Sequence, residues 1–200
     1  AASDVYKRQG QSDSNIRRIF TTGFQSEWKS TMERQLLVIS PKARLLSVDY
    51  GKNPKDYQAA PIKITFRYEI PDYALRGEGE MFFRPMVMNN LYNQVRSYMW
   101  IDTSVENRKY GFKDGCSRLV ELDETIQLPA GYKLVSAAKD ETMQGVGADF
   151  EGSLVQKGNK VLLHNRLALK KRVYEASDWE SFRNAVNAHK AYGEYLVIKK

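Results

Sequence analysis

The chain has 200 residues, 42% of them hydrophobic and 28% charged, so its length and composition predict one or two folded domains and exclude a wholly disordered chain. The net charge of +7 favours acidic partners in general, without indicating a fold or a particular partner. A single cysteine, Cys116, excludes an internal disulfide, and no apolar run approaches the ~18 residues that a membrane-spanning helix needs.

The first residues are set apart from the rest of the chain. Residues 1–9 have no apolar segment of the kind found in signal peptides, and Ser-Asp-Val-Tyr-Lys-Arg-Gln resembles a scar that recurs at the ends of assembled reading frames. We therefore predict a non-native or unstructured leader over residues 1–9 and a single β-rich domain over residues 10–200, with a sub-division near residues 100–116. On this interpretation the natural protein continues upstream, and the chain is its C-terminal part.

Helical periodicity comes next along the chain. Apolar residues recur at three- and four-residue spacing between Ser26 and Ile39, with Ser26 in position to cap the helix and Pro41 in position to end it. Beyond this helix, alternating apolar and polar residues predict strands at 44–50, 62–70 and 80–83. The strand at 62–70 has one apolar and one polar face, which is typical of a half-solvated antiparallel sheet.

The second half of the chain shows the same alternation. Strands are predicted at 117–128, 132–138, 147–156 and 160–173, with a hairpin tip at Lys157-Gly158-Asn159. Ser177 and Glu180 have the spacing of a capping box, which predicts a helix after Ser177 and then a final strand up to Lys199. The whole pattern predicts a mainly β chain: an antiparallel β-sandwich-like domain with an N-terminal helix, and a C-terminal helix followed by a final strand.

Cys116, His164 and Asp178 follow one another in the order of enzymes with a Cys-His-Asp triad, so they are the sharpest catalytic candidates. A nucleophilic thiol is usually held as thiolate by a helix N-terminus and an adjacent imidazole. The residues after Cys116 predict a strand, and Asp178 is better explained as a first-turn helix residue whose carboxylate favours the helix dipole. We therefore predict no complete catalytic site and keep a small cysteine enzyme as the least favoured function.

Other classes of site find little support in the residue spacing. The two histidines and Cys116 are too far apart in the sequence to supply a zinc-ligand pair, so no metal or cofactor is predicted, and His189 is interpreted as a surface or edge residue. Basic residues between Lys157 and Arg172 alternate between two faces of a strand, which argues against binding to nucleic acid.

Aromatic residues near predicted loops give a second possible function. Exposed rings can stack on sugars or peptides, so an independent glycan- or peptide-binding module is kept as the alternative function. The candidate residues are Tyr57, Tyr92, Tyr98 and Trp100.

The segment from Ile126 to Leu134, Ile-Gln-Leu-Pro-Ala-Gly-Tyr-Lys-Leu, resembles a strand, Leu-Pro-x-Gly-Tyr, strand segment of bacterial transglutaminase-like proteins. In such a segment Pro and Gly turn one strand into the next. Further similar segments lie at 68–74, 81–85, 147–153, 160–173, 174–183 and 195–200. The resemblance covers residues 40–200 and departs from the family at 108–112, where Arg-Lys-Tyr-Gly-Phe replaces an arginine followed by a Tyr-Pro segment.

Proteins of this family have an N-terminal domain of unknown function, a papain-like core and a C-terminal β-rich domain of unknown function. The resemblance implies that the chain corresponds to the last domain and that the catalytic Cys-His-Asp core lies upstream, so that none of its residues is in this chain. It also implies a location in the bacterial cell envelope or periplasm. The expected function is a non-catalytic accessory domain that supports or docks to the adjacent catalytic domain of the parent protein.

Overall fold

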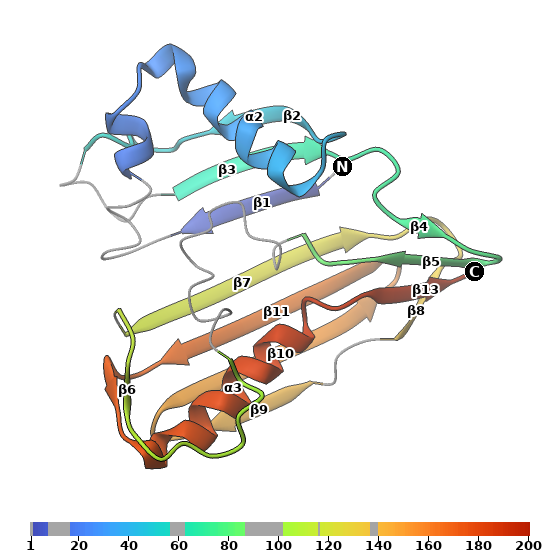
Figure 1. Cartoon of the computed structure of the whole chain (residues 1–200). Helices are drawn as coiled ribbons and strands as arrows, with labels where there is room; N and C mark the ends of the chain where they lie inside the picture. The colour runs from blue at the N-terminus through green and yellow to red at the C-terminus, as the bar shows by residue number, and fades with distance from the viewer. Residues whose placement is uncertain (1, 8–16, 57–62, 87–101, 116, 137–139) are drawn as a thin grey trace. The chain divides into compact units, whose positions relative to one another are not determined.

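A computed structural model describes residues 2–7, 17–56, 63–86, 102–115, 117–136 and 140–200 (Figure 1). The chain divides into two compact units, one of residues 1–73 and 90–95, the other of residues 74–89 and 96–200. The sequence predicted instead one domain over 10–200 with a sub-division near 100–116.

The first unit contains a three-stranded antiparallel sheet. Its strands are β1 (Ala2–Lys7), β2 (Arg44–Asp49) and β3 (Lys63–Glu69), in the order β1-β3-β2. The structure thus places residues 2–7, predicted as an unstructured leader, in a strand that pairs with β3 from Ala2 opposite Tyr68 to Lys7 opposite Lys63. Residues 2–7 are thus in a strand, while the prediction that residues 1–9 are a non-native leader stays a prediction.

The predicted N-terminal helix is present in the same unit. A 3-10 turn, η1 (Gln25–Glu27), leads into α2 (Trp28–Ile39), which buries Trp28, Met32 and Leu36 as the periodicity predicts. Ser26 does not cap α2, because it lies inside the 3-10 turn. The carboxylate of Glu27 instead accepts a hydrogen bond from the backbone N–H of Phe24 at 3.2 Å. Trp28 also forms edge-on ring contacts with Phe20 and Tyr50, which help to build the core of this unit.

The second unit is built on a four-stranded antiparallel sheet. Its strands are β7 (Arg118–Gln127), β9 (Glu141–Gln144), β10 (Ala148–Lys157) and β11 (Lys160–Leu169), in the order β7-β11-β10-β9. We call it the large sheet. The predicted hairpin tip is confirmed, since Lys157 pairs with Lys160 and Gly158 adopts a φ of 61° in the two-residue turn. Strand β9 was not predicted from the sequence.

The predicted strand 160–173 is wrong at its C-terminal end. Strand β11 stops at Leu169, and the short strand β12 (Val173–Tyr174) pairs with β6 (Phe112–Lys113) in a separate two-stranded sheet. A second four-stranded sheet contains β4 (Leu75–Arg76), β5 (Glu80–Phe83), β8 (Lys133–Ser136) and β13 (Leu196–Lys199), in the order β4-β5-β13-β8. The prediction of a final strand near the C-terminus is therefore confirmed, and this strand, β13, lies between β5 and β8.

Helix α3 (Trp179–Ala191) covers one face of the large sheet (Figure 1). Its apolar side buries Trp179, Phe182 and Val186, as the sequence predicts. Gly152, in the middle of β10, allows the closest approach, because a Cβ atom at this position would lie 2.5 Å from the ring of Tyr192 just beyond the helix.

Two predictions about this helix are corrected by the structure. His189 is not a surface residue: it is fully buried, with its Nδ1 atom 2.5 Å from the side-chain oxygen of Asn165 on β11. Ser177 does not cap the helix either. A 3-10 turn, η5 (Ala176–Asp178), precedes α3, and the backbone N–H of Glu175 donates to the Asp178 carboxylate at 2.8 Å. His189 is buried because α3 packs against the large sheet, and Ser177 is not the cap because it lies inside the turn η5.

The predicted fold class is confirmed: the chain is mainly β and antiparallel, with an N-terminal helix and with a C-terminal helix followed by a final strand. Among the residues that the structure describes, no helix is both long and apolar enough to cross a membrane.

Candidate functional site

The two faces of the large sheet differ in what covers them. Side chains alternate along each strand, so the face under α3 carries the buried residues of β10 and β11, among them Phe150, Leu163 and Asn165. The opposite face, which we call the open face, carries side chains that are exposed or half-buried. Its residues on the three longest strands include Leu119, Glu121, Asp123 and Thr125 on β7, Leu162, His164, Arg166 and Ala168 on β11, and Asp149, Glu151, Ser153 and Val155 on β10.

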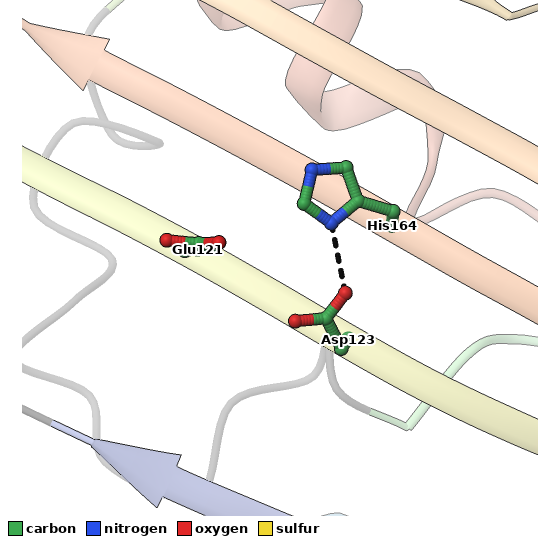
Figure 2. Close-up of side chains that lie close together, drawn as sticks. All are labelled: Glu121, Asp123 and His164. Atoms are coloured by element: carbon green, nitrogen blue, oxygen red, sulfur yellow. Dashed lines mark hydrogen bonds and ion pairs between the residues drawn. The ribbon is translucent and has the colours of Figure 1, made fainter.

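A cluster of one imidazole and two carboxylates lies on the open face (Figure 2). His164 stands directly opposite Asp123 in the β7–β11 register, and its Nδ1 atom lies 2.8 Å from an Asp123 carboxylate oxygen. Glu121 is two residues before Asp123 and therefore points to the same side of β7. One nitrogen or oxygen atom from each of the three residues lies within 4.8 Å of the others. These residues form the candidate site.

The strands hold the backbone of this cluster in place, while its side chains remain accessible. Strands β7 and β11 are paired over ten residues, and β10 pairs with the other edge of β11. The side chain of His164 is 31% exposed and that of Asp123 is 72% exposed. A small ligand can therefore reach the polar atoms without any movement of the sheet.

The charge around the cluster is mixed. Arg166 on β11 stands opposite Glu121 on one side and Glu151 on the other. Its guanidinium group offsets part of the negative charge of the two carboxylates in the cluster. The site can thus attract a cation, but less strongly than an isolated pair of carboxylates would.

The structure does not bring His164 and Asp178 together as a catalytic triad requires. Asp178 precedes α3, and one of its carboxylate oxygens lies 2.6 Å from the Lys171 ammonium group. The hydrogen bond from Lys171, followed by that from the Glu175 backbone, holds the pKa of the Asp178 carboxyl below its usual value. His164 has Asp123 as its carboxylate partner instead. Cys116, the third candidate, lies outside the described residues.

The aromatic candidates for glycan or peptide binding also lie outside the described residues. These are Tyr57, Tyr92, Tyr98 and Trp100. The alternative function, an independent glycan- or peptide-binding module, therefore stays a prediction.

Sequence reasoning did not select Glu121 and Asp123 as ligands, because neither belongs to a recognisable ligand motif. The alternation within 117–128 does place both residues on one polar face of a strand. The sequence does not allow us to predict that this strand pairs with β11 rather than with a strand nearer in the chain. That pairing alone brings His164 beside them.

Comparison with known proteins gives one family and one similar solved structure. Residues 79–197, more than half of the chain, match the model of a family described as "Domain of Unknown Function with solved-structure structure (DUF3858)". The crystal structure of "a putative protease from Parabacteroides distasonis ATCC 8503" is similar over 51% of this chain and 21% of that chain, with 13% sequence identity and a TM-score of 0.44. The chain thus spans about a fifth of the length of that protein. No curated protein matches the chain.

Proposed function

Because the chain belongs to the DUF3858 family of domains of unknown function, we propose that it is a non-catalytic accessory domain of a transglutaminase-like protein of the bacterial cell envelope. In this role it supports or docks to a catalytic domain encoded upstream in the same parent protein. The family match over residues 79–197 is the observation that carries the proposal, together with the resemblance of residues 40–200 to the C-terminal domain of such proteins.

The position of Asp178 supports a non-catalytic role. The carboxylate of Asp178 is bonded to Lys171 and to the backbone of Glu175, so it is occupied in holding the start of α3. It is therefore unavailable to orient His164 as the third member of a triad would.

The open face supports a docking role. Val155 on β10 is 39% exposed and stands directly opposite the half-buried Leu162 on β11. Leu119 on β7 is 58% exposed and stands opposite Ala168, farther along the same face. Exposed apolar side chains on a sheet face are typical of a surface that another domain covers. We propose that the catalytic domain of the parent protein covers this face.

Reconstitution from two separate chains tests the docking. The upstream part of the parent reading frame is expressed alone, mixed with this chain and analysed by size-exclusion chromatography. We expect one complex, and we expect Leu119→Arg to weaken it because the substitution replaces an exposed apolar side chain of the open face with a charge. Leu75→Arg is the matched control, since Leu75 is 59% exposed on the short strand β4 of another sheet. The proposal fails if no complex forms, or if both variants weaken it equally.

An activity assay tests the non-catalytic role separately. The chain alone is expected to show no hydrolysis or acyl transfer on glutamine-containing peptides. Activity that disappears in Cys116→Ser and in His164→Gln would overturn this part of the proposal and favour the cysteine-enzyme alternative.

A further inference from the structure

The Glu121–Asp123–His164 cluster combines donor atoms that metal ions select. An imidazole nitrogen and two carboxylate oxygens from the neighbouring strands β7 and β11 lie within 4.8 Å of one another on the open face, and Figure 2 shows the three side chains. Neither the family match nor the proposed accessory function assigns a role to these three residues. None of them belongs to the hydrophobic core of the second unit either.

We propose that Glu121, Asp123 and His164 form a binding site for a divalent transition-metal ion of the zinc type. Imidazole is a good ligand for zinc and its neighbours in the transition series, whereas calcium and magnesium prefer sites made of oxygen atoms alone. Three protein ligands leave the fourth tetrahedral position to water. The site goes beyond the accessory function and does not depend on it.

The distances in the cluster fit such an ion after a small adjustment of side chains. Tetrahedral ligands at about 2.0–2.2 Å from zinc lie about 3.4 Å from one another, whereas the donor atoms lie within 4.8 Å. The hydrogen-bonded pair His164–Asp123 already spans only 2.8 Å. Glu121 is exposed, and rotation about its side-chain bonds provides the remaining approach without moving the backbone.

The surroundings set the expected affinity. The strands fix the backbone of all three ligands, which lowers the entropic cost of binding. In the isolated chain the open face leaves the ion exposed to water, and Arg166 opposite Glu121 adds a repelling positive charge. We therefore expect binding in the micromolar range, with zinc bound more tightly than magnesium.

Calorimetric titration of the full chain with ZnCl₂ tests the proposal. Because a thiolate also binds zinc, the measurement uses a Cys116→Ser background. We expect one ion per chain, and we expect His164→Gln and Asp123→Asn each to weaken binding by about tenfold or more, since each removes one ligand. Glu151→Gln is the matched control, because Glu151 is an exposed carboxylate of the open face outside the cluster. It is expected to keep the affinity of the background chain.

A second measurement does not rely on substitutions. The visible absorption spectrum of the Co²⁺-loaded chain reports the geometry around the ion, and we expect a four-coordinate spectrum with nitrogen and oxygen ligands. The proposal is overturned if the background chain binds no zinc, or if His164→Gln and Asp123→Asn bind it as tightly as the background chain. Circular dichroism checks that the variants are folded. Since the titration uses the isolated chain, its failure would leave the docking proposal intact.

Discussion

His189 is a buried titratable residue beneath helix α3. Its side chain is fully enclosed, and burial, with a smaller contribution from the neighbouring charge of Lys190, lowers the pKa of the imidazole from 6.5 to about 3. The folded protein thus holds this imidazole neutral, beside the side-chain oxygen of Asn165. The unfolded chain, in contrast, takes up a proton on this residue once the pH falls below 6.5.

The protonation of His189 predicts an acid-sensitive fold. Above pH 6.5 the residue is neutral in both states and contributes no pH dependence. Between pH 6.5 and 3 it lowers the free energy of unfolding by up to about 1.4 kcal/mol for each pH unit. We expect His189→Gln to reduce this slope in urea unfolding measured from pH 7.5 to 4.5. The comparison variant is His164→Gln, at the other histidine of the chain; an equal loss of slope there would contradict the assignment to His189.

Asp178 stabilises the start of α3. Its carboxylate accepts from the backbone of Glu175 and pairs with Lys171 while the side chain is almost fully buried. We expect Asp178→Ala to lower the free energy of unfolding by about 1–2 kcal/mol, because the substitution leaves the half-buried ammonium group of Lys171 and a backbone N–H without their acceptor. Equilibrium unfolding in urea at pH 7 measures the change.

Ser177→Ala is the control for this prediction. Ser177 is the residue that the capping-box spacing favoured, but it is exposed and lies inside the turn η5. Its substitution is expected to change stability by no more than about 0.5 kcal/mol. A larger loss of stability in Ser177→Ala than in Asp178→Ala would contradict this role of Asp178 and favour the capping box predicted from the sequence.

At the scale of elements, the packing of α3 on the large sheet depends on Gly152. A Cβ atom at this position would lie 2.5–2.7 Å from ring atoms of Tyr192 and Phe150. We expect Gly152→Ala to destabilise the protein by roughly 1–3 kcal/mol, because either the rings or the helix must move away from β10. Thermal unfolding followed by circular dichroism measures the effect.

Gly115→Ala tests whether this cost is specific to the contact with α3. A Cβ atom at Gly115 would have no neighbour within 4 Å, and its backbone does not need the left-handed region. We expect this variant to unfold at nearly the wild-type temperature. Equal destabilisation by the two substitutions would contradict the packing argument.

Elements were predictable from the sequence where their pattern is local. The spacing of Trp28, Met32 and Leu36 predicts α2, and the alternation in residues 160–169 predicts β11, because burial on one side repeats with the period of the element. Strand β9 was missed, since its four residues Glu-Thr-Met-Gln carry a single apolar side chain. The end of β11 was misplaced because Val173 and Tyr174 continue the apolar pattern while pairing with β6.

At the scale of the whole molecule, the division into two compact units predicts separable local stability. A substitution that loosens the large sheet is expected to leave the first unit protected, because each unit has its own core. We expect Gly152→Val to accelerate hydrogen exchange in β10 and β11 while β3 keeps its protection. Mass spectrometry of peptides from both units measures this. Equal loss of protection in β3 would indicate one cooperative unit.

The candidate site could be predicted from the sequence only in part. The polar face of 117–128 and the position of His164 on a strand both followed from alternation, because the pleat of a strand sends neighbouring side chains to opposite sides. Strand order does not follow from alternation. Between β7 and β11 the chain forms β8, β9 and β10, and only the folded sheet shows that β11 lies between β7 and β10.

By itself, the sequence determined that this is a mainly β chain with a helix near each end, whereas the absence of a complete Cys-His-Asp site stays a prediction. These conclusions rest on residues close together in the chain, whose spacing reflects local geometry. Only the tertiary structure decided that His164 meets Asp123 and Glu121, that His189 is buried and that Asp178 holds the start of α3. Each of these depends on contacts between distant residues, which form when burial of apolar surface selects one strand order and one docking position for the helix.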